Sequence, residues 1–301
     1  MWPLTGTNFF PSRARCCPSC RSRTITVGAD KVTEYYHAAV VCHLVGFDLA
    51  LPLDVEPVRP GETEPAAAMR LLARVFRNYP RFFDAVVGDA LYLQGPFFNF
   101  CLAHGKHVMA VLKGNNPALL EDARGLLSEV EPVDWQEGAR RVLCWDMEGF
   151  TTNEGIEAPL RVMHTEETVV GRHRIAGEWV SAVESQSWWW ATTIPAMLLS
   201  APRLCRAGHA RWDVENDLFN VLATDWHLDH CCKHEPNAII NFVLTLFIAF
   251  VLVQSFYKQN LKPEPRRRFT LIGLALELLV GLAEARLAAA WSGRRPTRSP
   301  P

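Results

Sequence analysis

Apolar residues in the first part of the chain change from strand-like to helical spacing. Segment 34–44 is rich in aromatic and β-branched residues, and the apolar segment 49–58 follows after a short connection that contains Gly46, which predicts neighbouring antiparallel strands. Pro60 and Gly61 then break this pattern. Apolar residues at helical spacing follow and predict a helix over 62–76.

Two short apolar segments further along, 82–87 and 108–112, have the length and valine content of buried strands. Helices are predicted over 98–104 and over 117–127, where Pro117 occupies the first turn. From residue 34 the predicted order is therefore strand, strand, helix, strand, helix, strand, helix. This alternation favours an α/β fold.

The second half of the chain has a different pattern. Short β-like pieces separated by polar connections predict an all-β insertion over 134–194, and a helical block follows over 195–262. The last region, 263–301, is predicted to contain a helix and a disordered tail, because residues from 288 onward are rich in Pro, Arg and Ser. Residues 1–133 would form the first part of the core.

Composition narrows the class of protein. A chain that is 49% hydrophobic and 21% charged can bury a sizeable core, and its formal net charge of -1 gives no overall attraction to nucleic acid. Any DNA contact must therefore come from local patches. Nine cysteines, an odd number, without a secretory signal predict a reducing cytoplasm. The chain has no GxxxxGK[ST] loop and no GxSxG turn, which disfavours nucleotide hydrolysis and serine-hydrolase chemistry.

Two acidic residues stand where a fold can present a carboxylate on a rigid support. Asp89 directly follows an apolar strand, so its side chain can leave the core and enter a cleft. Glu215 lies in the segment GHARWDVENDLFNVL, whose apolar positions indicate an amphipathic helix with the glutamate on another face. Each has an ordinary alternative role: Asp89 can cap the following segment, and Glu215 can pair with Arg211 on a solvated face.

A resemblance to a known family lies in the stretch AVVGDALYLQGPFFNFCLAHGKHVMAVLKGNNPALLEDAR. It is similar to the second-aspartate region of IS4-like DDE transposases, where strand, Asp, helix and strand precede a Lys-x-Asn-x-Pro turn. The segment ARWDVENDLFNVL resembles the glutamate helix of that family, which carries Arg-x3-Glu. The two motifs occur in the family's order, with a β-rich insertion between them. The resemblance extends from about Leu4 to Asn260.

The resemblance implies an RNase H-like α/β fold, with a mixed five-stranded sheet flanked by helices and a β insertion before the last catalytic helix. It implies DNA transposition, a recombination reaction in which two Mg²⁺ or Mn²⁺ ions roughly 3.5–4 Å apart support strand cleavage and strand transfer. Asp89 and Glu215 would be catalytic and metal-binding. The partners would be transposon ends and target DNA, bound by a homo-oligomer at the bacterial nucleoid, without a membrane. The residues that would contact DNA are Lys113, Asn115, Arg211 and Trp212.

Departures from the family pattern predict impaired catalysis. Thr5 stands where the first Asp of the family is expected, and a neutral hydroxyl substitutes poorly for a bridging carboxylate. Asp48 and Asp54 are possible replacements, but they fall on other strands. Gly208 and Leu222 occupy the Tyr and Lys positions of the family's extended signature, so recognition of the element end is also in doubt. We therefore expect a copy with missing upstream chain, and a catalytically silent DNA-binding remnant is the alternative.

A second metal is suggested by soft ligands near the N-terminus. Cys17-x2-Cys20, followed by His37 and Cys42, contains enough ligands for a tetrahedral structural zinc site, although the second half lacks a standard spacing. A coincidental pair of cysteines is the competing interpretation. Three further histidines, His227, His230 and His234, have a spacing that could place them on one face of a helix.

A distant alternative class is a single-span membrane protein. Residues 238–257 contain no charged side chain over about 20 positions, the length needed to cross a bilayer, and basic residues follow. Four polar residues interrupt the segment, and the resembled family places an apolar helix under its sheet at this point. Basic residues such as Lys106, His107 and the run 266–268 are further candidates for phosphate contacts or for an ordinary solvated face.

Overall fold

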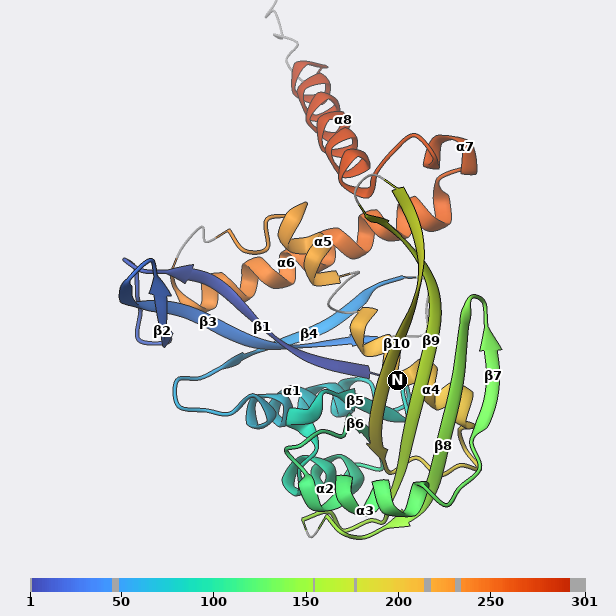
Figure 1. The fold of residues 1–301 in the computed structure, drawn as a ribbon. Coiled ribbons are helices and arrows are strands. Elements are labelled where there is room, and N and C mark those ends of the chain that lie inside the picture. Colours follow the sequence, from blue (N-terminus) through green and yellow to red (C-terminus); the bar gives the residue numbers. More distant parts are fainter. Residues whose placement is uncertain are drawn as a thin grey trace, which may run out of the picture.

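A twisted mixed sheet passes through the molecule, with helices on both of its faces (Figure 1). The computed structural model describes residues 2–44, 49–153, 155–175, 178–213, 218–230 and 234–292. The strand order is β2-β3-β1-β5-β6-β10-β9-β8-β7, and β4 pairs with β3. The strands and helices of the first part, in chain order, are β1 (Trp2–Ser12), β2 (Arg21–Val27), β3 (Asp30–Leu44), β4 (Leu51–Val58), α1 (Glu64–Asn78), β5 (Ala85–Gly88), the 3₁₀ turn η1 (Ala90–Tyr92), α2 (Gly95–Ala103), β6 (His107–Val111) and α3 (Pro117–Leu127).

This first part has the RNase H-like arrangement that the sequence predicts. β3 is antiparallel to β1 and β4, whereas β5 is parallel to β1 and β6. Every strand and helix expected between residues 34 and 127 is present, with boundaries that shift by a few residues. The strand β2, which forms a hairpin with β3, was not expected, because its alternating Arg, Ser and Thr residues are mostly exposed.

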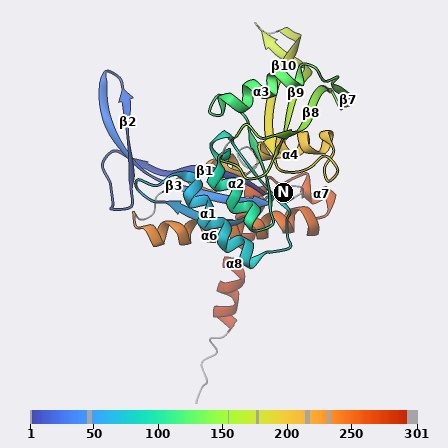
Figure 2. The ribbon, with the colours of Figure 1, turned by 90° about the horizontal axis from the view of Figure 1, so that it is seen from below.

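The predicted insertion is a long antiparallel meander. Its strands are β7 (Val133–Glu137), β8 (Arg140–Phe150), β9 (Leu160–Ile175) and β10 (Glu178–Thr192). The sequence predicted only short pieces here, because polar residues along the solvated parts of β9 and β10 interrupt the apolar pattern. β10 pairs with β6 through Trp190–Thr192, so the meander extends the core sheet (Figure 2).

The C-terminal part is helical. Its elements are α4 (Ala201–Asp213), α5 (Asn220–Thr224), α6 (Pro236–Ser255), the π-helical turn η3 (Phe256–Asn260), α7 (Pro263–Arg266) and α8 (Leu271–Ser292). α8 projects away from the sheet in both views (Figures 1 and 2). The expectation of disorder from residue 288 onward is wrong for 288–292, because these residues continue α8 with its helix-favouring alanines. Residues 293–301 lie outside the described part.

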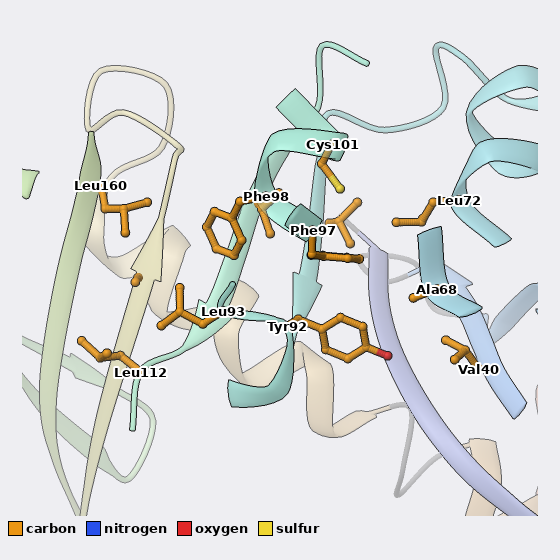
Figure 3. Close-up of a cluster of buried hydrophobic side chains, with 14 of the residues drawn as sticks. Val40, Ala68, Leu72, Tyr92, Leu93, Phe97, Phe98, Cys101, Leu112 and Leu160 are labelled. Carbon is orange, nitrogen blue, oxygen red and sulfur yellow. The ribbon is translucent and has the colours of Figure 1, made fainter. Parts of the chain in front are cut away.

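Side-chain alternation along the strands buries both faces of the sheet. On β3, Val40 and Cys42 face the core under α1 to α3, whereas Val41 faces the core under α5 and α6. β5 and β6 are similarly apolar on both faces, with α4 covering the second one. Figure 3 shows part of the first core, in which Phe97 of α2 lies on the side of Leu72 of α1 and Phe98 lies on the side of Leu160.

The apolar helix α6 covers the sheet. Together with η3 it is one helix of the described chain that is long and apolar enough to cross a membrane. Its buried residues Ile239, Val243, Phe247 and Phe250 recur at helical spacing and pack in the second core. The buried side chain of Gln254 accepts a hydrogen bond from the Ala50 N–H at 2.6 Å. These contacts pack one face of α6 on the sheet, whereas apolar side chains such as Ile248 and Leu252 are exposed.

Candidate active site

The ends of β5 and β6 lie side by side in the core sheet, and the other side of β5 pairs with the first residues of β1. Trp2 and Pro3 of β1 pair in parallel with Val86 and Val87 of β5. Two residues further along the same register, Thr5 lies in line with Asp89. The structure therefore brings the backbone of the expected first and second aspartate positions together, although the side chain of Thr5 lies outside its described part.

Asp89 leaves the sheet directly after β5. Its Oδ1 accepts a hydrogen bond from the Leu91 N–H at 2.8 Å and thereby caps η1, so the simple capping role is present. The carboxylate is half-buried. A Cβ on Gly88 would lie 2.8 Å from the side chain of Tyr92, so only glycine lets the chain fold back at this point. The rigid strand and this turn fix the position of Asp89.

A carboxylate that was not expected from the sequence lies beside this edge. Glu64, at the start of α1, accepts hydrogen bonds from the Tyr92 hydroxyl at 2.7 Å and from the Gly6 N–H. A Cβ on Gly6 would overlap the Glu64 carboxylate. Burial raises the pKa of Glu64, the hydrogen bond from Tyr92 lowers it, and the charge of Asp89 raises it again, with a net upward shift. Figure 3 shows Tyr92 with its hydroxyl directed away from Leu93.

The other carboxylates considered as replacements for the first Asp are differently placed. Asp54 on β4 forms an ion pair with Arg74 of α1 at 3.0 Å and accepts from the Val55 N–H at 2.8 Å. Its neighbour Glu56 pairs with Arg70 at 3.0 Å. These carboxylates attach α1 to β4. Asp48 lies outside the described residues.

The turn after β6 lies next to the turn that carries Asp89. The Asn115 side chain donates a hydrogen bond to the Ala90 carbonyl at 2.7 Å, and Asn116 donates to the Leu93 carbonyl at 3.1 Å. Lys113 is exposed in this turn and makes its cation available to a ligand at the same edge. Asn115 thus has a structural role in joining two turns, and a DNA contact for it stays a prediction.

The helix α4 is held against the other face of the sheet. A Cβ on Gly208 would lie 2.6 Å from the Trp190 ring, so a side chain at this position would collide with the ring. His209 contacts the Glu167 carboxylate of β9 at 2.7 Å. Burial opposes ionisation of Glu167, but its hydrogen bond with His209 and the charge of Arg140 lower its pKa overall. These contacts anchor α4 to the meander.

The end of α4 carries Arg211, the first residue of the predicted Arg-x3-Glu motif. The guanidinium of Arg211 lies 4.1 Å from the centre of the Trp212 ring, and Arg211 is only 4% exposed. Trp212 also meets Trp188 edge to face at 5.9 Å. Phosphate would therefore have to approach a largely covered guanidinium, and a DNA contact for Arg211 and Trp212 stays a prediction. Glu215 lies outside the described residues.

Two of the additional phosphate-binding candidates already have partners within the chain. Lys106 is 8% exposed, and its ammonium donates to the carbonyls of Pro80 and Phe83 at 2.7 Å. It therefore holds the turn before β5. Arg268 pairs with Glu264 at 3.1 Å on an exposed surface, as expected for a solvated face.

The predicted soft ligands are only partly brought together. Cys17, Cys20 and His37 cluster, but the fourth member is His234 and not Cys42. Cys42 is buried in the first core, because it lies five residues after His37 on β3 and therefore on the opposite face. The helical face expected for the later histidines is also wrong, since His227 and His230 lie in turns and His227 has a φ of 56°.

Sequence reasoning missed the roles of Glu64, Tyr92 and His234. All three depend on contacts between segments far apart in the chain. The only local signal for Glu64 was its position directly after a Pro-Gly turn and before an apolar helix, which also suits an ordinary first-turn acidic residue.

Comparisons with known proteins place these features in a family. A search of curated proteins finds no match to the chain. A family model described as transposase DDE domain matches residues 17–252, which include β5, the meander, α4 and most of α6. The match begins after Thr5, so it does not test the assignment of the first carboxylate. Because the matched region covers most of the chain, this protein belongs to the DDE transposase family.

Proposed function

We propose that this chain is an IS4-like DDE transposase whose DNA strand cleavage and strand transfer are impaired by Thr5. The observation that supports the proposal is the register of β1 against β5, which, when continued by two residues, puts Thr5 of β1 in line with Asp89 just after the end of β5. DDE chemistry needs carboxylates at both positions and a third on a later helix. Glu215, four residues after Arg211 in the segment that resembles the glutamate helix, is our choice for the third.

The chemistry of the donors fits Mg²⁺ or Mn²⁺. Both ions prefer oxygen ligands, and Asp89 offers a half-buried carboxylate whose Oδ1 accepts a backbone hydrogen bond. When bound, the ions would activate the attacking oxygen and stabilise the leaving oxygen of the phosphodiester. Lys113 is positioned to bind a DNA phosphate beside Asp89, since its turn is hydrogen-bonded to the turn after β5 through Asn115.

Thr5 is the reason that we expect impairment. A threonine hydroxyl is neutral, so the site lacks the negative charge that an aspartate would add at this position of β1. The Glu64 carboxylate already accepts hydrogen bonds from the Tyr92 hydroxyl and the Gly6 N–H. We assign Glu64 as a positioning residue that holds β1 at Gly6 against η1.

A second candidate function is a catalytically silent DNA-binding protein with the same fold. This alternative is favoured by the threonine at position 5, where the family has an aspartate. The exposed Lys113 would still bind phosphate. Assembly as a homo-oligomer on transposon ends, in the bacterial cytoplasm, is part of both proposals.

The test is nicking of DNA that carries the ends of the encoding element, with Mg²⁺ or Mn²⁺. We would compare the wild-type chain with Thr5→Asp, and with Thr5→Asp combined with Asp89→Asn. We expect weak or no nicking by the wild-type chain and clear nicking by Thr5→Asp. The nicking should be lost when Asp89→Asn is added. Asp84→Asn in the Thr5→Asp background is the matched control, because Asp84 is exposed at the opposite end of β5.

The outcomes separate the two functions. Nicking restored by Thr5→Asp and abolished by Asp89→Asn supports an impaired transposase. DNA binding by all variants without nicking supports the silent DNA-binding protein. Full activity of the wild-type chain, unchanged by Thr5→Asp, would refute the role that we assign to Thr5.

A further inference from the structure

Four soft ligands from three distant parts of the chain converge near the end of the sheet. Cys17 and Cys20 lie in the turn between β1 and β2, His37 lies on β3, and His234 immediately precedes α6. Their ligand atoms all lie within 4.8 Å of one another. Cys20 and His234 are 214 positions apart in sequence, so local chain geometry cannot account for this contact.

The distances are those of a tetrahedral zinc site. Zinc bonds of about 2.3 Å to sulfur and about 2.0–2.1 Å to nitrogen imply about 3.8 Å between two sulfurs and about 3.6 Å between sulfur and nitrogen. The two Sγ atoms are 3.9 Å apart. His37 Nε2 lies 3.5 Å from each Sγ, and His234 Nε2 lies 3.6 Å from the Cys20 Sγ.

The local backbone is arranged to present both cysteines. The Cys20 N–H donates to the Cys17 carbonyl at 3.0 Å, which closes the turn. The Cys17 N–H donates to the Cys20 Sγ at 3.3 Å and thus supports a sulfur that carries negative charge. Neighbouring Cys16 is exposed and is not part of the cluster.

Neither a disulfide nor ordinary polar packing accounts for the cluster. A disulfide needs an S–S distance of about 2.0 Å, far shorter than the 3.9 Å between these sulfurs. Among the described residues, one other group has similar ligand spacing, formed by Glu167, Cys205 and His209. There the charge of Glu167 is already paired with Arg140 at 3.0 Å, whereas the ligands around Cys17 have no such ion pair among the described contacts.

We propose that Cys17, Cys20, His37 and His234 bind one structural Zn²⁺ ion that fastens the start of α6 to β3 and to the turn after β1. The site is distinct from the carboxylate edge and does not depend on the proposed nuclease activity. It has four protein ligands and hence no open position, as structural rather than catalytic zinc sites do. The metal would stabilise the folded chain by linking the start of α6, which packs on the sheet through the second core, directly to β3 and to the turn between β1 and β2.

The test uses the full chain purified under reducing conditions, with bound zinc measured by plasma mass spectrometry. We expect about one zinc per chain, retained by Cys16→Ser and lost from Cys17→Ser and His234→Ala. Cys16→Ser is the matched control, because it removes a thiol directly beside the proposed ligand. Thermal unfolding followed with and without a zinc chelator should show a lower Tm after chelation for the wild-type chain and for Cys16→Ser only.

Replacement of zinc by Co²⁺ guards against variants that simply fail to fold. The wild-type chain should give the absorption of tetrahedral cobalt with two thiolates. His234→Cys should retain the metal, and because it adds a third thiolate its thiolate band should be more intense by about one half. A wild-type chain that takes up neither zinc nor cobalt, or that isolates with a Cys17–Cys20 disulfide, would overturn the proposal. So would a His234→Ala variant that keeps zinc as tightly as wild type.

Discussion

Burial of His43 in the sheet predicts how the stability of the protein changes with pH. It lies near the end of β3 and is 3% exposed, and neither ring nitrogen has a hydrogen-bond partner among the described residues. Burial lowers the pKa of His43 from 6.5 to about 4. The imidazole is therefore neutral in the folded chain at pH 5, whereas the unfolded chain binds a proton there.

The sign of the effect follows from proton linkage. Because the folded pKa is lowered, the unfolded state binds more protons between pH 6.5 and about 4, and stability falls as the pH decreases through this window. One pKa unit corresponds to about 1.4 kcal/mol, so the full penalty is about 3 kcal/mol. Between pH 7.5 and pH 5 the contribution of His43 amounts to a loss of about 2 kcal/mol.

The perturbation is His43→Leu, which has a similar volume and removes the titrating group. Urea unfolding of wild type and variant at pH 7.5 and pH 5.0 gives four free energies of unfolding. The free energy of unfolding of the variant minus that of wild type should be about 2 kcal/mol larger at pH 5.0 than at pH 7.5. His230→Leu reports the effect of the same change at an exposed position. A difference between wild type and His43→Leu that stays constant with pH would refute the reasoning.

Three further predictions concern α4, the meander and the DNA-binding edge. Gly208→Ala should destabilise the chain by about 1–3 kcal/mol in urea unfolding, because the added methyl group overlaps a buried ring, whereas Gly125→Ala in open space on α3 should stabilise it slightly. Arg161→Met should cost about 3–5 kcal/mol, since Arg161 is 2% exposed and its loss leaves Asp146 without its ion-pair partner. Lys113→Ala should weaken DNA binding and reduce the salt dependence by about 0.9 in the slope of log K against log salt. An unchanged slope in that titration would place Lys113 outside the interface.

The elements that the sequence predicted best are those with strong local patterns. The helix at Pro117–Leu127 begins with a proline and has a regular apolar stripe, so both of its ends were predicted. The strand β2 was missed because exposed polar residues occupy much of it, and the length of β9 was missed because polar residues such as Arg161, Thr165 and Glu167, which are buried, interrupt its apolar pattern. In these strands cross-strand pairing, which involves residues distant in sequence, stabilises the conformation.

The same limit applies to the candidate site. The position of Asp89 was predicted, because an apolar strand followed by an acidic residue is a local signal. The contact between Glu64 and Gly6 joins α1 to β1, and no local pattern indicates it. For the soft ligands, the spacing of Cys17 and Cys20 was informative, but the choice between Cys42 and His234 depended on which side of β3 faces the start of α6.

The positions of α4 and His234 connect the two proposed metal sites. α4 is fixed to the meander by His209 and Glu167, and the cysteine cluster includes His234 just before α6. Glu215 lies in the chain between these two anchors. Leu218, Leu222 and Leu228 pack in the second core between them, so loss of either anchor would loosen the packing on one side of this core and raise the entropic cost of assembling the carboxylates. Zinc loss should therefore reduce any strand cleavage restored by Thr5→Asp, even though no zinc ligand belongs to the carboxylate edge.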